Sequence, residues 1–145
     1  MSDEKRIIDA NILVYALDTS APDHKRQKAL ELMKSGFKRQ EEFCIALQSL
    51  EEFTVVVTRK IDNPLDVQVA RNHVQDINAA RNFQVLETSP GAVIEAMGYY
   101  KEGQDYWESL IAAVMRENDV RKILTENVSE FKDIEGVEAV NPFSG

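Results

Sequence analysis

Residues 6–15 read Arg6-Ile7-Ile8-Asp9-Ala10-Asn11-Ile12-Leu13-Val14-Tyr15. The apolar pair Ile7-Ile8 predicts a short buried strand that ends at Asp9, and the residues from Asn11 to Leu17 predict a helix directly after it. An acidic residue therefore stands where a strand passes into a helix. In α/β folds this junction is where ligands gather, because the carboxyl ends of parallel strands meet the N-termini of helices there.

The rest of the chain repeats this alternation of strand and helix. Further strands are predicted at Phe43–Ala46, Phe83–Leu86, Val120–Leu124 and Val137–Val140. Helices are predicted between them, over about residues 20–35, 48–60, 63–80, 89–103 and from 105 onward. This order predicts an α/β fold, with a mostly parallel central sheet covered by helices on both faces.

Capping residues predict several helix ends. Ser89-Pro90 and Asp105 are typical of helix starts, and Pro22 predicts the start of the second helix. Gly36 is expected to cap the C-terminus of that second helix. Asn63-Pro64 is expected to open the fourth helix as a cap followed by a proline in the first turn.

The composition predicts a single globular domain spanning residues 1–145. Hydrophobic residues make up 43% and charged residues 29% of the chain, and it has no internal repeat and no linker rich in Pro, Gly and Ser. No apolar run approaches the roughly 18–20 residues of a membrane helix, and the N-terminus has no secretory apolar region. Because Cys44 is the only cysteine, we expect a cytoplasmic protein without an internal disulfide.

Charge limits the possible ligands. The formal net charge of −8 argues against binding phosphate backbones over the whole surface, so a nucleic-acid substrate would need metal ions or a local basic patch. Arg59 and Lys60, or Lys25-Arg26 and Lys28, are candidates for such a patch, although basic residues also commonly decorate helix surfaces. Two histidines and one cysteine are too few for a zinc site, so a bound metal would be magnesium or manganese on oxygen ligands.

Polar side chains recur where predicted strands end and predicted helices begin. They are Asp9, Glu51, Glu52, Glu108, Glu126, Asn127 and Glu130. Because parallel strands share one carboxyl edge, a single site could collect these residues. Carboxylates a few Å apart repel by about 4 kcal/mol per pair near a surface. Such a cluster therefore needs protons or cations, and magnesium or manganese suits it.

Each acid alone also fits a structural role. Asp9 can cap the helix that follows it, and Glu51 and Glu52 can be solvated acids favoured by a helix dipole. Asp105-Tyr106-Trp107-Glu108 has capping-box spacing, in which Glu108 accepts a hydrogen bond from the Asp105 backbone. Acids such as Glu126 and Glu130 in a polar loop commonly face solvent. Their shared location is what favours a functional site.

Four stretches together resemble the motifs of PIN-domain nucleases, in particular the VapC-type toxins. The first has the strand–Asp–x–Asn pattern, and in the second the similarity selects Glu52 over Glu51. The match keeps order and spacing along nearly the whole chain. The stretches are Ile7–Tyr15, Gln48–Lys60, Tyr106–Ala113, and Ile123–Asn127 with Gly136–Phe143.

The resemblance implies a three-layer α/β/α PIN fold and an RNA-cleaving toxin that depends on Mg²⁺ or Mn²⁺. It also implies a homodimer and a VapB-like antitoxin that blocks the site. Asp9, Glu52 and Glu108 would be metal ligands, with Asn127 as the fourth catalytic position. On this hypothesis Asn11 would hold the Asp9 carboxylate, and Thr125 would contact a metal water or a substrate phosphate. Asn127 or Glu126 would complete the site, and Arg59 would belong to the basic patch.

Two residues depart from the family pattern. Glu108 is one methylene longer than the usual Asp, and Asn127 replaces the fourth acid, so Glu126 or Glu130 would have to substitute. With one charge fewer, we expect weak binding of a second metal and slow activity that favours manganese. The alternative is a catalytically weakened PIN-like domain that binds RNA or regulates. A phosphotransferase with Asp9 as nucleophile is disfavoured, because that class resembles Asp-x-Asp and this chain has Asp9-x-Asn11.

Overall fold

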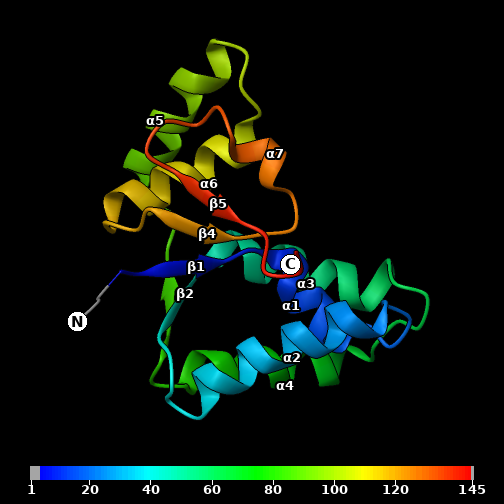
Figure 1. The fold of residues 1–145 in the computed structure, drawn as a ribbon. Coiled ribbons are helices and arrows are strands. Elements are labelled where there is room, and N and C mark those ends of the chain that lie inside the picture. Colours follow the sequence, from blue (N-terminus) through cyan, green and yellow to red (C-terminus); the bar gives the residue numbers. More distant parts are fainter. Residues whose placement is uncertain (1–3, 145) are drawn as a thin grey trace.

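The computed structural model describes residues 4–144, and within them five strands form one sheet (Figure 1). The strand order is β3-β2-β1-β4-β5, and every neighbouring pair is parallel. The predicted α/β class with a mostly parallel sheet is therefore confirmed. The strands are β1 (Arg6–Ile8), β2 (Phe43–Ala46), β3 (Phe83–Leu86), β4 (Lys122–Leu124) and β5 (Glu138–Val140).

Helices cover both faces of this sheet (Figure 1). One face carries α1 (Ala10–Leu17), α2 (Asp23–Phe37), α3 (Leu47–Arg59) and α4 (Val67–Ala79), and the other carries α5 (Pro90–Lys101), α6 (Tyr106–Glu117) and α7 (Val128–Phe131). Within residues 4–144, none of the helices combines the length and the apolar character that crossing a membrane requires.

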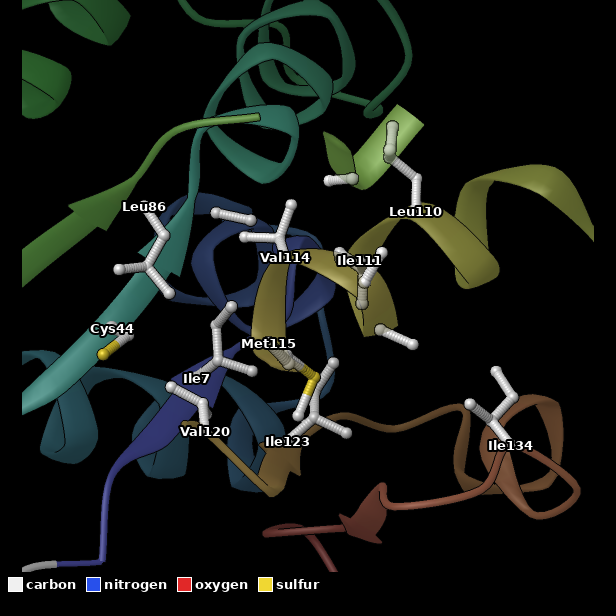
Figure 2. Close-up of a cluster of buried hydrophobic side chains, with 14 of the residues drawn as sticks. Ile7, Cys44, Leu86, Leu110, Ile111, Val114, Met115, Val120, Ile123 and Ile134 are labelled. Carbon is white, nitrogen blue, oxygen red and sulfur yellow. The ribbon is translucent and has the colours of Figure 1, made fainter. Parts of the chain in front are cut away.

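Alternation along the strands builds a core on each face. Ile7 belongs to the cluster under α5 and α6, whereas its neighbour Ile8 belongs to the cluster under α1 to α4. Both side chains are fully buried, because successive strand residues point to opposite faces. Figure 2 shows the first cluster, in which Ile7 packs beside Met115 of α6 and Ile123 of β4. The sheet is thus a rigid central layer from which loop residues project.

Two predicted helix ends are wrong. Gly36 does not cap α2 but lies inside it, where an added Cβ would stand 2.3 Å from the Phe83 ring, so the glycine is required by close packing. The helix continues to Phe37, and Arg39 takes the left-handed conformation after it. Asn63-Pro64 does not open α4; Asp66 does, with its side chain accepting a hydrogen bond from the Gln68 backbone.

The predictions at Ser89 and Asp105 are confirmed, since each side chain caps its helix. The short helix α7 was not predicted. It has only four residues, which is too short to produce a helical repeat of apolar positions, although Phe131 within it is buried. This single turn follows β4 and therefore lies at the same edge of the sheet as Asp9.

Candidate active site

The chain reverses its direction of travel across the sheet at β1, which lies between β2 and β4. In open parallel sheets such a switch point leaves a crevice beyond the carboxyl ends of the strands. A pocket of about 430 Å³ lies there. Among the residues that line it are Asp9, Glu52, Asp105, Glu108, Asn127 and Glu130. The structure therefore brings together the four residues predicted as catalytic, Asp9, Glu52, Glu108 and Asn127, which span more than a hundred positions in the sequence.

Asp9 has the capping role considered from the sequence, and it also lines the pocket. It is the N-cap of α1, and its Oδ1 atom accepts a hydrogen bond from the Ala10 backbone at 2.8 Å. Its Oδ2 atom accepts one from the Thr125 hydroxyl at 2.7 Å. Burial raises the pKa of Asp9, while these two hydrogen bonds oppose that effect. The Asp9 carboxyl therefore has a fixed orientation at the carboxyl edge of the sheet, and burial has removed much of its hydration.

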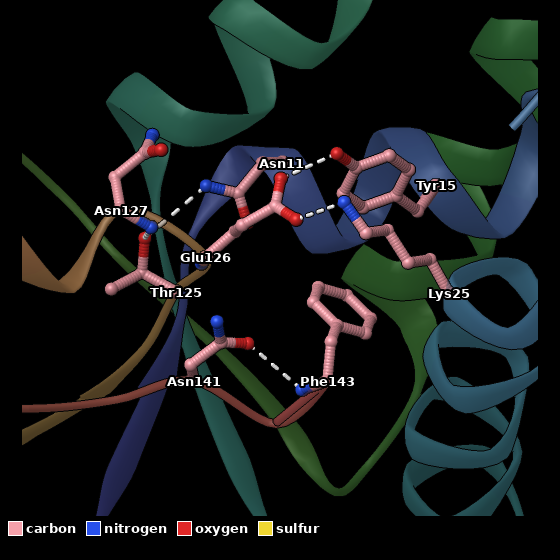
Figure 3. A network of polar contacts seen from close by, with 8 residues as sticks. All are labelled: Asn11, Tyr15, Lys25, Thr125, Glu126, Asn127, Asn141 and Phe143. Carbon is pink, nitrogen blue, oxygen red and sulfur yellow. Dashed lines mark hydrogen bonds and ion pairs between the residues drawn. The ribbon is translucent and has the colours of Figure 1, made fainter. Parts of the chain in front are cut away.

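Thr125 connects Asp9 to the loop after β4. Its side chain is 0% exposed, and its hydroxyl accepts hydrogen bonds from the Asn11 amide at 3.2 Å and from the Asn127 backbone at 3.0 Å (Figure 3). A hydroxyl has one donor and two acceptor positions, so all of its capacity is used. The expected contact of Thr125 with a phosphate or a metal water is therefore replaced by a positioning contact with Asp9.

Asn11 completes this arrangement. Its amide nitrogen lies 3.4 Å from Asp9 Oδ2, and its side-chain oxygen accepts a hydrogen bond from the Glu126 backbone at 3.3 Å. The expected contact between Asn11 and the Asp9 carboxylate is present. One asparagine therefore joins the start of α1 to the end of β4, and the two segments hold Asp9 between them.

Glu52 of α3 and Glu108 of α6 reach the pocket from opposite sides of the sheet. Burial and then the negative charge of Asp9 raise the pKa of Glu52, and the charge of Lys60 partly opposes this. For Glu108, burial and then the charges of Asp105 and Glu130 raise the pKa to about 7. The pocket is therefore a place where carboxylates disfavour one another's ionisation.

The capping-box role considered for Glu108 is met only by its backbone. The Glu108 N–H donates to the Asp105 side chain at 3.0 Å, whereas the Glu108 carboxyl lines the pocket and shares a hydrogen bond with Glu130. Asp105 caps α6 and lines the same pocket. From the sequence, Asp105 is predicted only as a helix cap.

The donor chemistry of this pocket fits a hard divalent cation. Within the part of the chain that the structure describes, no three His, Cys, Asp or Glu side chains already form a complete ligand cluster. Asp9, Glu52 and Glu108 nevertheless face one cavity with raised pKa values, and Asn127 adds an amide oxygen donor. Carboxylate and amide oxygens are the ligands that magnesium and manganese prefer.

Glu126 is held away from this pocket. Its carboxylate accepts a hydrogen bond from Tyr15 and forms an ion pair with Lys25 (Figure 3). Burial by itself would raise the pKa of Glu126, but the hydrogen bonds from Lys25 and Tyr15 outweigh it and lower the pKa. Of the two residues considered as substitutes for the fourth acid, Glu130 lines the pocket and Glu126 lies outside its lining.

Tyr15 was not singled out from the sequence, although it lies four residues after Asn11 and hence on the same side of α1. It lines the pocket, and its ring packs edge-on against Phe143 at 5.2 Å. The closing stretch after β5 therefore returns to the site (Figure 3). Helical spacing from Asn11 is the signal that could have identified Tyr15.

The basic residues are distributed differently from the expectation. Arg59 is exposed at the end of α3 and lies outside the pocket lining. Lys60, its neighbour, is the residue whose charge acts on Glu52. Glu51 is exposed and also lies outside the lining, so α3 directs Glu52 and not Glu51 toward Asp9.

A pH-dependent stability difference follows from the Glu108 carboxyl. The folded-state pKa of about 7 lies above the ordinary 4.5, so wild-type protein loses stability as the pH rises through this interval. In metal-free buffer, Glu108→Gln should therefore raise Tm at pH 8, by about 2–4 °C if solvent screening leaves roughly 1 kcal/mol. It should give no gain below pH 4.5. Thermal melts of both proteins at several pH values, with Glu51→Gln as control, measure this; an equal effect at both extremes would contradict it.

Comparison with known proteins adds the family. A family model described as the PIN domain matches residues 6–137. No curated protein sequence is significantly similar to the chain.

Several solved structures share the fold. FitAcB from Neisseria gonorrhoeae is 12% identical with a TM-score of 0.66, covering 97% of this chain and 99% of that one. VapC20 from Mycobacterium tuberculosis, a sarcin-ricin loop cleaving toxin, is 12% identical with a TM-score of 0.65, covering 90% and 97%. DNA-bound VapBC from Salmonella typhimurium is 18% identical with a TM-score of 0.62, covering 97% and 99%. At these identities the similarity concerns the fold.

Proposed function

The chain belongs to the PIN domain family, and on that premise we propose that it is a single-domain, divalent-metal-dependent ribonuclease that hydrolyses RNA phosphodiester bonds. The observation that carries this proposal is the convergence of Asp9, Glu52 and Glu108 on one pocket at the switch point of the sheet. Three acids from separate parts of the chain line this pocket together. Each has a raised pKa, so the site favours a proton or a cation.

The proposed ligands are Asp9, Glu52 and Glu108, with Asn127 as a neutral fourth donor. A bound Mg²⁺ or Mn²⁺ would polarise a phosphoryl oxygen, activate water and neutralise the leaving oxygen. The protein's own contribution is positioning: Thr125 and Asn11 fix the Asp9 carboxyl, and the α3 and α6 helices bring the two glutamates to it. No side-chain nucleophile is required in this scheme, since water is the attacking group.

We further propose that the protein is the toxin of a VapBC-type pair, acting as a homodimer and inhibited by a VapB-like antitoxin. The support is the fold shared with the toxin VapC20, with VapBC and with FitAcB. The acidic pocket also suits such control, because a basic side chain of a partner would neutralise the same carboxylates that bind metal.

A second candidate function is a catalytically weakened PIN-like domain that binds RNA or regulates. The observation that favours it is the neutral Asn127 at the pocket, beside a Glu108 that shares a proton-dependent hydrogen bond with Glu130. The two candidate functions can be distinguished by incubating the protein with a panel of single-stranded, hairpin and ribosomal RNAs in Mn²⁺, Mg²⁺ or EDTA. Metal-dependent cleavage that Asp9→Asn abolishes supports the nuclease, and RNA binding without cleavage supports the alternative.

Titration calorimetry with Mn²⁺ tests the metal stoichiometry. We expect one ion to bind, with any second ion at least about tenfold weaker, because Asn127 brings no charge to the fourth position. Asn127→Asp should strengthen the second event. Two tight sites of similar affinity in the wild-type protein would contradict the proposed ligand set.

A further inference from the structure

Trp107 is the chain's only tryptophan, and its side chain is 61% exposed. Tryptophan is among the most buried residues on average, so a largely exposed one needs a reason. It precedes Glu108 in the first turn of α6, and it lines the same pocket as Asp9, Glu52 and Asn127. A large, flat aromatic surface is therefore presented to solvent beside the proposed metal ligands.

Trp107 is held in place from behind. The Gln48 side-chain amide donates a hydrogen bond to the Trp107 carbonyl at 3.3 Å, which links α6 to the first turn of α3. The Tyr106 ring contacts the indole edge-on, with centroids 5.1 Å apart and planes at 79°. Tyr100 supports Tyr106 in the same edge-on manner at 5.8 Å. These contacts stabilise one side of the indole and leave much of its remaining surface open.

We infer that Trp107 is a stacking site for a nucleobase of single-stranded RNA, next to the phosphodiester that is cleaved. This inference rests on the proposed ribonuclease function and names the substrate class of that site. A nucleobase can stack its flat face on an aromatic ring, and this contact does not require charge. A base within a duplex has its faces covered by its neighbours, so the nucleotide that Trp107 binds must be unpaired.

The electrostatics of the pocket give this stack its importance. The pocket lining includes Asp9, Glu52, Asp105, Glu108 and Glu130, and the chain carries a formal net charge of −8. Phosphates are repelled by such a surface, so contacts to the RNA backbone can supply little of the affinity that they usually provide. Base stacking is insensitive to this repulsion and can hold a nucleotide in the site.

A protein partner is the competing occupant. Exposed apolar side chains on α5, Ile94, Met97 and Tyr100, lie outside the pocket lining. A partner that docked on α5 could extend to Trp107. The position of Trp107 inside the lining, adjacent to a proposed ligand, favours the nucleobase over the protein.

The fluorescence of this single tryptophan gives a direct test. Asp9→Asn protein with Mn²⁺ would be titrated with a 12-nucleotide single-stranded RNA and with the same RNA in a duplex. We expect saturable quenching of Trp107 by the single strand and little by the duplex. In parallel, Trp107→Ala in the active protein should weaken single-strand binding and raise KM by about 5–100-fold, with kcat nearly unchanged. Trp107→Phe should recover part of the loss.

Ile94→Ala is the control, because Ile94 is a large apolar residue that is 71% exposed but lies outside the pocket lining. It should leave KM and quenching unchanged. An unaltered KM in Trp107→Ala, or an emission that responds to protein concentration and not to RNA, would overturn the stacking site. Cleavage by wild type with a normal KM in Trp107→Ala would overturn stacking and leave the nuclease intact. Quenching without any cleavage by wild type would support stacking and contradict the nuclease.

Discussion

Asp9→Asn is expected to reduce RNA cleavage by about 10³-fold, which corresponds to roughly 4 kcal/mol of lost transition-state stabilisation. Asp9 is the only one of the three proposed ligands that the structure fixes through both carboxylate oxygens, from Ala10 and Thr125. The amide keeps the shape of the side chain and removes its charge. Initial rates on a labelled single-stranded RNA with saturating Mn²⁺ measure the effect.

Folding should survive this change. Burial raises the pKa of Asp9, so the folded protein already disfavours the charged carboxylate, and a neutral amide avoids that desolvation cost. The amide can accept only one of the two hydrogen bonds that Asp9 receives, which offsets this gain, so the Tm of Asp9→Asn in EDTA at pH 7 should stay within about 4 °C of wild type. Asp66→Asn is the matched control, because Asp66 is also a helix N-cap but lies outside the pocket. Full activity in Asp9→Asn would refute the proposed metal site.

Thr125→Val is expected to lower Mn²⁺ affinity by about 10–100-fold, although Thr125 is too deeply buried to touch the ion or the RNA. The valine cannot donate to Asp9 and cannot accept from Asn11 or from the Asn127 backbone. Asp9 would then lose its fixed direction. Three hydrogen-bonding groups would be left short of a partner, which should also cost about 1–3 kcal/mol of stability.

Thr125→Ser separates positioning from packing. Serine keeps the hydroxyl and deletes a buried methyl group, so it should be somewhat destabilised but retain Mn²⁺ affinity within a few fold of wild type. Calorimetric titration with Mn²⁺ and thermal melts of both variants measure the two effects separately. Equal affinities in the valine and serine variants would mean that the hydroxyl does not position Asp9.

The local pattern of the sequence determined the class of fold. Short segments rich in apolar residues, most of them alternating with helical repeats, were sufficient to predict the five strands that the structure describes, and Ser89 and Asp105 marked helix starts that the structure contains. The site's location also followed from local information, because residues at the carboxyl ends of parallel strands must share one edge. Asp9, Glu52 and Glu108 were selected on that basis together with the resemblance.

Local signals failed where distant contacts compete with them. Gly36 resembles a helix cap, but it is needed inside α2 because the Phe83 ring, from a strand far along the chain, occupies the space of its side chain. Asn63 and Asp66 are both good caps by composition, and the sequence alone does not rank them. In the structure Asn63 bonds to Thr19 and Asp66 caps α4.

The roles of individual polar residues were decided by tertiary structure alone. Because β4 lies beside β1, Thr125 meets Asp9 across 116 positions of sequence. The Thr125 hydroxyl donates its hydrogen bond to the Asp9 carboxylate. The same placement brings Glu126 to Lys25 and Tyr15, and leaves Glu130 at the pocket. The periodicity of apolar residues in the sequence indicates which side chains are buried and whether they lie in a helix or a strand. Which charges meet depends on strand order, because each carboxylate binds whichever donors the fold brings within reach.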